Sequence, residues 1–298
     1  MKIYDCFQYM DEDVVLDLRF NYLNDFVDNF IIVESTFTHS GKKRKTTFDI
    51  SKYPKFKDKI KYLVLDKEPS NLDEIKKDDD ELTKNTKKIL NPTKREFLQR
   101  ELLMSGIQEA AEEDIILLSD VDEIPKLENI NLRNMKNRFI FFKQKMFYYK
   151  FNLCSESIDW FGTKACKKKD LKSFQWLRNI KPKNYPLWRF DIFFHKKKYN
   201  NILFVNDGGW HFSYIKTPEG IQNKLQSYAH HLEYDLNPIG VSNIAEKIKN
   251  KESIYNLNTD MKMSNSRFSR GQVLSVIDFN HLPNYLKKNK EKFKEWLE

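Results

Sequence analysis

The chain has 298 residues, of which 40% are hydrophobic and 14% aromatic, so it can bury a sizeable core, and wholesale disorder is excluded. Lysine and arginine outnumber aspartate and glutamate by 52 to 43. The charge of +9 suits nucleic acid, anionic lipid or a diphosphate-bearing substrate, unless it reflects only a lysine-rich surface.

Cysteine usage and the N-terminal segment bear on the compartment. The cysteines Cys6, Cys154 and Cys166 show no CxxC spacing, which argues against a disulfide scaffold and is typical of a reducing compartment. The N-terminal segment lacks the apolar stretch of a signal peptide, and no window approaches the ~18 consecutive apolar residues of a membrane span. We therefore expect a cytoplasmic protein without a membrane-spanning helix.

The first 120 residues alternate between strand and helix patterns. Residues 15–26 carry apolar side chains at helical spacing, and residues 93–113 form the clearest predicted helix. Thr93 and Glu96 would begin that helix with a capping box just after Pro92. Short apolar runs predict four strands, at residues 3–7, 30–33, 62–65 and 115–118. This alternation predicts an α/β fold with a mostly parallel central sheet.

Residues 66–92 differ from their surroundings, because they are polar, charged and almost without aromatic side chains. This composition predicts a mobile loop beside the sheet. The loop is either a tolerated surface insertion or a lid over a substrate.

The second half of the chain is more aromatic. Residues 139–151 alternate in part and predict a strand, and residues 167–170 predict a turn. Helices are expected at 218–232 and 238–250. The final segment, 285–298, has apolar residues near one helical face among lysines, so it docks on the protein's own body or makes a peripheral membrane contact. No repeat or linker divides the chain, which predicts a single domain over 1–298.

The sharpest local signal is the segment IILLSDVDEIP at residues 115–125, where an apolar strand runs directly into acidic residues. In an open parallel sheet, ligands bind beyond the carboxyl ends of the strands. Asp120 and Asp122, a DXD motif, can there share one divalent cation that bridges a substrate diphosphate. The alternative is a polar loop with helix caps.

The second signal is NDGGWHFSY at residues 206–214. Gly208 and Gly209 permit close backbone approach, and Trp210 offers apolar surface. His211 is either a packed core histidine or the ligand that completes a metal site begun by the acidic motif. An imidazole among carboxylates suits Mn²⁺ better than Ca²⁺.

Read together and in chain order, several stretches make the sequence resemble glycosyltransferase family 17 over most of its length. They are IYDCF, REFLQRELLMSGI, DVDEIP, FGTKAC, GGWHFSYIKTPEGIQNKL and LPNYLKKNKEKF. The resemblance implies a single domain with a GT-A-like, Rossmann-like fold. In such a domain, residues 1–125 would bind the nucleotide sugar, and residues 126–298 would form the acceptor half and the C-terminal helices. It also implies inverting transfer of a sugar, with UDP-GlcNAc as the favoured donor, onto a glycan acceptor through a β-linkage.

The resemblance also implies site residues. Asp120 and Asp122 match the family's acidic motif, and His211 is a further ligand of Mn²⁺ or Mg²⁺. Glu34 lies where GT-A proteins hold the nucleoside. The other expected donor contacts are Gly208, Gly209 and Trp210, with Arg100 and Arg178 as phosphate partners unless they form structural ion pairs. The general base is left open among Asp191, Glu233 and Asp159.

Two other functions compete with glycosyl transfer. A metal-dependent nucleotidyltransferase also uses carboxylates at strand ends, although it would need more of them near the motif. A basic, non-catalytic nucleic-acid-binding protein would explain the charge, but the lysines are scattered and no nucleic-acid-binding motif is present. We therefore expect a nucleotide sugar and a carbohydrate as partners, and no nucleic acid.

Overall fold

The computed structural model describes residues 1–186, 188, 195–255 and 271–298. Within these ranges, the centre of the fold is a ten-stranded mixed sheet. The strand order is β3-β2-β1-β4-β7-β6-β9-β5, with β10 beside β7 and β8 beside β6. The strands are β1 Ile3–Tyr9, β2 Asn29–Ser35, β3 Ile60–Leu65, β4 Ile115–Asp120, β5 Glu123–Pro125, β6 Phe139–Tyr148, β7 Leu153–Lys167, β8 Ile202–Val205, β9 Gly209–Ser213 and β10 Ser275–Val276.

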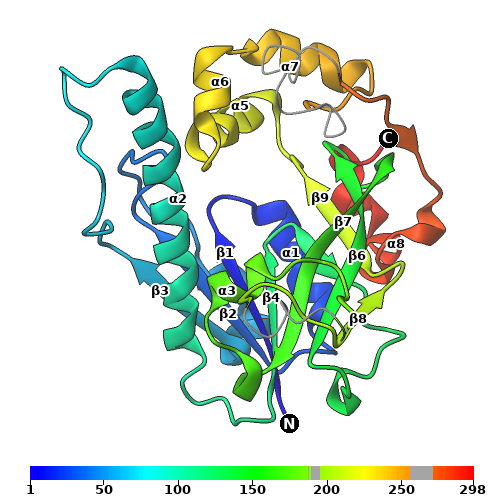
Figure 1. Cartoon of the computed structure of the whole chain (residues 1–298). Helices are drawn as coiled ribbons and strands as arrows, with labels where there is room; N and C mark the ends of the chain where they lie inside the picture. The colour runs from blue at the N-terminus through cyan, green and yellow to red at the C-terminus, as the bar shows by residue number, and fades with distance from the viewer. Residues whose placement is uncertain (187, 189–194, 256–270) are drawn as a thin grey trace.

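Helices lie on both faces of this sheet and beyond the carboxyl ends of its first strands. Figure 1 shows α2 running along one side and α5, α6 and α7 gathered above the sheet. The helices are α1 Asp13–Leu23, α2 Glu81–Gly106, α3 Phe174–Asn179, α5 Pro218–Ser227, α6 His231–Leu236, α7 Gly240–Lys249 and α8 Asn284–Lys288. None of the helices in these ranges is long and apolar enough to cross a membrane.

The prediction of a mostly parallel sheet is wrong. β3, β2, β1 and β4 are parallel, as expected, but β7 runs antiparallel to both β4 and β6. The partly alternating pattern from residue 139 marks a hairpin, in which Tyr149 adopts a left-handed φ of 64° in the short connection. Antiparallel neighbours need only such a short turn, whereas parallel strands need a long crossover.

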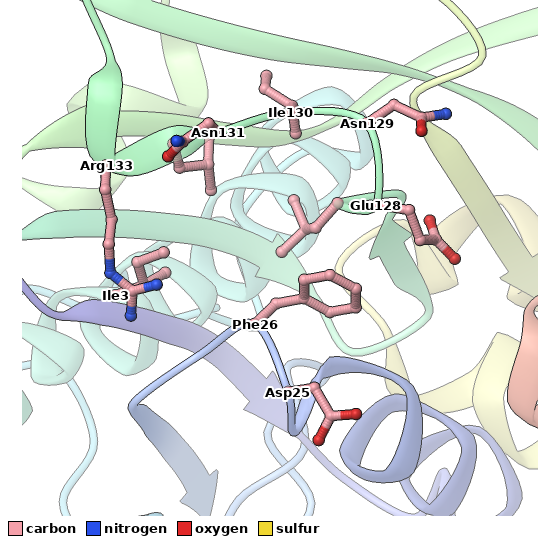
Figure 2. Close-up of a pocket in the computed structure, with 10 residues that line it drawn as sticks. Ile3, Asp25, Phe26, Glu128, Asn129, Ile130, Asn131 and Arg133 are labelled. Atoms are coloured by element: carbon pink, nitrogen blue, oxygen red, sulfur yellow. The ribbon is translucent and has the colours of Figure 1, made fainter.

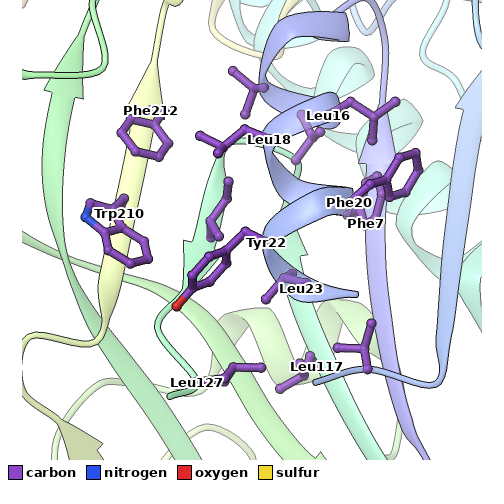
Figure 3. Packing of buried hydrophobic residues seen from close by; sticks show 14 of the residues in the cluster. Phe7, Leu16, Leu18, Phe20, Tyr22, Leu23, Leu117, Leu127, Trp210 and Phe212 are labelled. Atoms are coloured by element: carbon purple, nitrogen blue, oxygen red, sulfur yellow. The ribbon is translucent and has the colours of Figure 1, made fainter. Parts of the chain in front are cut away.

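Two apolar clusters hold α1, α2 and α3 against the sheet, and a further cluster packs α5, α6 and α7 against β6 and β7. On one face, α1 packs against the sheet and β9, and Figure 3 shows Phe20, Tyr22 and Leu23 of α1 together with Trp210 and Phe212 of β9. On the other face, α2 and α3 cover a cluster that includes Ile31, Leu103, Ile116, Phe141 and Leu177. The strands β1, β2 and β4 are therefore buried on both faces, which explains their continuous apolar runs, whereas the edge strand β3 is only half-buried.

The long helix α2 corrects the prediction for residues 66–113. The helix begins at Glu81, where Asp80 accepts a hydrogen bond from the Thr83 backbone N–H at 2.6 Å. Thr93 is inside the helix and donates its hydroxyl to the Ile89 carbonyl, so the predicted capping box does not form. Pro92 is tolerated within the helix, and only residues 66–80 of the predicted loop lack regular structure.

The C-terminal segment docks on the body of the protein, which is the first of the two alternatives that the sequence left open. α8 and the following 3-10 helix, Lys290–Trp296, bury Leu286 and Phe293 in the same apolar cluster as α1. The Phe293 ring meets the Phe151 ring edge-on at 5.5 Å. The apolar side of this segment is thus occupied by the protein itself.

A buried ion pair joins α1 to the central strands. Arg19 on α1 and Asp5 on β1 are fully buried and lie 2.6 Å apart. The guanidinium also donates to the backbone carbonyls of Asp120, Val121 and Glu123 at 3.3, 3.2 and 2.8 Å. This single side chain therefore fixes the turn between β4 and β5.

We predict that Arg19→Met lowers the free energy of unfolding by ~3–5 kcal/mol, because it leaves the buried Asp5 carboxylate without a counter-charge. Urea denaturation measures the change. The matched control is Arg133→Met, whose ion pair with Asp28 at 2.8 Å is 48% and 36% exposed and should contribute only about 0–1 kcal/mol. Equal losses in the two variants would contradict the anchoring role of Arg19.

Candidate functional site

A cavity of about 380 Å³ lies at the carboxyl ends of the parallel strands. Its walls come from the ends of β1, β2 and β4, from one side of α2, and from β7, β9 and α5. The charged and histidine side chains in its lining are Glu12, His39, Arg44, Glu96, Asp120, Asp122, Arg178, His211, Lys224 and His230. The cavity thus gathers the acidic motif and the remote histidine that the sequence singled out.

Strand pairing brings His211 to the acidic motif. In the antiparallel β5–β9 ladder, Glu123 lies opposite His211, and the Phe212 N–H donates to the Asp122 carbonyl at 2.8 Å. Side chains alternate along β9, so Trp210 and Phe212 point into the apolar cluster while His211 points into the cavity. The register of β9 against β5 therefore places the His211 side chain in the cavity.

Asp122 is the centre of one ionic group. Its Oδ1 lies 3.4 Å from His211 Nε2, and its Oδ2 lies 3.0 Å from Lys224 Nζ. The Lys224 ammonium also lies 3.6 Å from a Glu12 carboxylate oxygen. His211 Nδ1 is buried and has no hydrogen-bond partner among the described residues. Both oxygens of Asp122 are therefore engaged.

These contacts set the charges of the group. Burial alone would raise the pKa of Asp122, but the Lys224 ammonium and the His211 imidazole outweigh it and hold that pKa well below its usual range. Burial would lower the pKa of His211, and the Asp122 carboxylate reverses that, so the pKa of His211 is raised. Asp122 is consequently a permanent anion.

Asp120 and Arg178 form a second ionic group beside the first. Arg178 lies 2.7 Å from an Asp120 oxygen and 3.0 Å from Glu123, while Arg100 approaches Asp120 at 3.6 Å. Burial opposes ionisation, but the two guanidinium groups keep the pKa of Asp120 below its usual value. The Trp160 indole N–H donates to Glu123 at 2.6 Å, which completes the support of this buried carboxylate.

A buried lysine supports Arg178 from below. Lys164 on β7 is 4% exposed and donates to the Ile180 carbonyl at 2.7 Å and to the Arg178 carbonyl, at the C-terminal end of α3. A cation at a helix C-terminus satisfies carbonyls that have no partner within the helix. Burial, followed by the nearby Arg178 guanidinium, lowers the pKa of Lys164 to about 7. Lys164 therefore positions the backbone that carries Arg178.

Other expected donor contacts do not line the cavity within the described residues. Glu34 is fully buried, pairs with Arg44 at 2.8 Å and accepts hydrogen bonds from the backbone of residues 47 and 48. Arg100 is 2% exposed and is bound to Glu96 at 2.6 Å. These two charges brace the walls: Glu34 holds the loop that carries Arg44, and Arg100 holds α2 against Asp120.

The GGW segment serves packing. Gly209 has a φ of 129°, and a Cβ there would lie 2.2 Å from the Ile124 carbonyl oxygen. A Cβ at Gly208 would lie 2.7 Å from the Val205 carbonyl oxygen. Trp210 is 4% exposed, and its ring meets Tyr22 edge-on at 5.2 Å (Figure 3). The glycines let β9 approach its neighbours, and Trp210 anchors it on α1.

Two of the three candidate bases do not line the cavity, and the third is not among the described residues. Asp159 pairs with Lys143 at 2.6 Å and is 55% exposed, and neither it nor Glu233 belongs to the described lining. Asp191 lies outside the described residues. The carboxylates that line the cavity besides the acidic motif are Glu12 and Glu96, neither of which the sequence marked.

Sequence reasoning also missed Lys224 and the aromatic wall beside it. Lys224 is 102 residues from Asp122, so only the tertiary fold pairs them, although the stretch GIQNKL that contains it was part of the family resemblance. The wall consists of Trp160, whose ring lies 5.3 Å from that of His211, and of the tyrosines Tyr148, Tyr214, Tyr228 and Tyr255. Aromatic enrichment was visible in the sequence, but its placement was not.

A divalent cation fits this site only if a ligand completes it. Within the described ranges, no group of three or more His, Cys, Asp and Glu side chains could hold a metal. Asp122 and His211 nevertheless present an oxygen and a nitrogen 3.4 Å apart, near the spacing of about 3 Å expected for adjacent ligands of Mg²⁺. Mg²⁺ is commonly bound by one or two carboxylates together with substrate phosphates, and an imidazole beside a carboxylate suits Mn²⁺. The residues present fit a metal that arrives with a phosphate-bearing ligand.

A second cavity, of about 440 Å³, lies at the amino end of β1. Figure 2 shows the Phe26 ring in it, with Asp25, Glu128 and Arg133 around it. Arg133 is already paired with Asp28, and Glu128 accepts the Tyr22 hydroxyl. This cavity contains neither the acidic motif nor His211.

Comparison with known proteins agrees with the sequence resemblance. The family model described as “Glycosyltransferase family 17” matches residues 1–298. The chain is 24% identical over 229 residues to each of three relatives named beta-1,4-mannosyl-glycoprotein 4-beta-N-acetylglucosaminyltransferase, from Homo sapiens, Rattus norvegicus and Mus musculus. Each match covers 72% of this chain and 40% of the relative, so the chain spans less than half the length of these relatives.

We predict that Lys164→Met removes a rise in stability between pH 7 and pH 10. Below a pH of about 7, Lys164 is charged in both states, and the folded state bears the full cost of burying that charge. Between about 7 and the ordinary value of 10.5, only the unfolded state keeps the proton, so stability increases with pH by up to about 1.4 kcal/mol per pH unit.

Urea denaturation gives the free energy of unfolding of the wild type and of the variant at each pH in this range. The difference between the two proteins isolates Lys164, because the contributions of the other titrating groups cancel. The exposed Lys145, replaced by Met, is the control and should leave the pH profile of the wild type unchanged. Parallel profiles for the wild type and Lys164→Met would refute the prediction.

Proposed function

The chain belongs to glycosyltransferase family 17, and from this premise we propose that it transfers a sugar from a nucleotide-sugar donor to a glycan acceptor in a metal-dependent, inverting reaction. The proposed donor is UDP-GlcNAc, because the relatives are named N-acetylglucosaminyltransferases. The observation that carries the proposal is the convergence of Asp122 and His211, 89 positions apart in the chain, at the carboxyl edge of the parallel strands.

The strand order supports a GT-A-like arrangement. The parallel part of the sheet runs 3-2-1-4, which is the order of a nucleotide-binding, doubly wound half-sheet. Ligands of such sheets bind outside the carboxyl ends of the strands, where the cavity lies. We propose that the part of the lining contributed by residues 1–125 receives the nucleotide and diphosphate.

Charge supports a diphosphate bound together with a metal. The lining contains four carboxylates, Glu12, Glu96, Asp120 and Asp122, and three permanent cations, Arg44, Arg178 and Lys224. A diphosphate added to this nearly balanced set brings excess negative charge into a partly buried site, which is costly without a counter-ion. A bound divalent cation supplies that charge and acts as a Lewis acid on the leaving diphosphate. We propose that Asp122 and His211 hold it, with Asp120 close by.

The residues of this chain have separate tasks in the proposed reaction. Arg178 lines the cavity, and its terminal nitrogens bind Asp120, Glu123 and the Gly162 carbonyl. In the proposed reaction it exchanges its bond to Asp120 for phosphate oxygens and stabilises the charge of the departing UDP. The aromatic wall from residues 126–298 offers rings on which sugars pack. The base for an inverting displacement has to reach the acceptor hydroxyl, and Glu12 and Glu96 are the carboxylates of the lining outside the proposed metal pair and its neighbour Asp120.

We predict that Asp122→Asn reduces UDP release from UDP-GlcNAc by at least ~100-fold, since the substitution keeps the shape of the side chain but removes its charge. UDP release is measured with Mn²⁺ and a panel of oligosaccharide acceptors. UDP with Mn²⁺ should raise the melting temperature of the wild type, and EDTA should cancel that rise.

The control is Asp207→Asn, which removes a surface carboxylate that is 64% exposed and paired with Lys126, and which should retain wild-type activity. Release of pyrophosphate in place of UDP would identify a nucleotidyltransferase and overturn the proposal. Activity of Asp122→Asn equal to that of the control would exclude the metal role of Asp122.

A further inference from the structure

Lys224 occupies the place beside Asp122 that a metal ion would share. Its ammonium contacts Asp122 Oδ2 at 3.0 Å, while His211 faces Oδ1 at 3.4 Å. The same ammonium lies 3.6 Å from Glu12 and 5.5 Å from the centre of the Tyr214 ring. A divalent cation bound to Asp122 and His211 would therefore meet a positive charge within contact distance of its own ligand.

The two cations would compete for one carboxylate, because like charges at this separation repel in a partly buried site. Lysine has a flexible four-carbon stem with a compact charge, so its ammonium can move without a change in the backbone. Lys224 lines the cavity and its side chain is 21% exposed. An incoming diphosphate offers the displaced ammonium new oxygen partners in the same cavity.

We propose that Lys224 is a resident counter-ion that holds Asp122 until the donor arrives, so that the metal and the nucleoside diphosphate bind cooperatively and neither binds well alone. In the free protein, the ammonium neutralises Asp122. When a diphosphate enters, Lys224 moves to the phosphate oxygens and Asp122 becomes available to the metal. This inference rests on the proposed function, since it assumes a metal at Asp122 and His211.

Reciprocity makes the inference measurable without turnover. If UDP increases the affinity for Mn²⁺ by some factor, Mn²⁺ must increase the affinity for UDP by the same factor. Electron paramagnetic resonance reports free Mn²⁺ directly, so binding to the full chain can be titrated with and without UDP. For the wild type we expect UDP to tighten Mn²⁺ binding by at least ~10-fold.

The variant Lys224→Met tests the counter-ion role independently of the metal site, because it removes the ammonium but keeps Asp122 and His211. We expect this variant to bind Mn²⁺ without UDP at least ~10-fold more tightly than the wild type does, because the competing charge is gone, and to show less coupling to UDP. Lys224→Arg keeps the charge and should retain the weak binding of Mn²⁺ alone. Lys247→Met, on α7 and 3.7 Å from Glu252, is the matched control for loss of a half-buried lysine and should behave as the wild type.

The outcomes distinguish this inference from the proposed function. Tight binding of Mn²⁺ to the wild type without UDP, abolished by Asp122→Asn and unchanged in Lys224→Met, would overturn the counter-ion role and leave the metal site standing. No binding of Mn²⁺ to any variant, even with UDP, would overturn the metal site itself. If Lys224→Met does not fold, Lys224→Gln, which removes the charge but keeps a polar side chain in the lining, allows the same comparison.

Discussion

The site depends on one buried contact, the Arg19 guanidinium beneath the turn that joins β4 to β5. Its charge is matched by Asp5, and its remaining donors bind the carbonyls of three residues of that turn. Arg19 binds the backbone carbonyls of the turn from the side of the apolar cluster. The carboxylates of Asp120 and Asp122 lie on the opposite side of the turn, where they line the cavity. Arg19 thus holds the acidic segment in one conformation, and a bidentate guanidinium suits this task better than an ammonium.

Around this turn, every charge of the acidic segment has a protein partner. Glu123 is fully buried between Arg178 and the Trp160 indole, and a Cβ at Gly162 would lie 2.9 Å from its carboxylate carbon. The glycine therefore leaves the room that this buried carboxylate needs. A charged ligand can replace one member of such an ion pair. Because the ligand brings its own charge, the remaining side chain is not left as an unpaired ion in a partly buried site.

Part of this arrangement was predictable from local sequence. The four apolar runs became parallel strands, and the acidic motif with His211 entered one cavity, because a strand end and an alternating strand direct these side chains by geometry alone. The start of α2 at Glu81 was not predictable, since tertiary packing carries the helix through Pro92 against its propensity. Lys224 and Glu12 were not predictable as site residues, because only the tertiary fold brings Lys224 into contact with Asp122 and Glu12 into contact with Lys224.

The cavity also divides by chemistry, and this division constrains how a donor and an acceptor can share it. Arg178, Arg44 and Asp120 lie toward the parallel strands and α2, whereas Trp160 and the tyrosines lie toward β6, β7, β9 and α5. Asp122 and His211 stand at the boundary, since His211 is next to the Trp160 ring and Asp122 follows β4. A diphosphate is favoured on the ionic side and a sugar ring on the aromatic side. In the proposed reaction, the bond between sugar and phosphate would then lie at this boundary, beside Asp122 and His211.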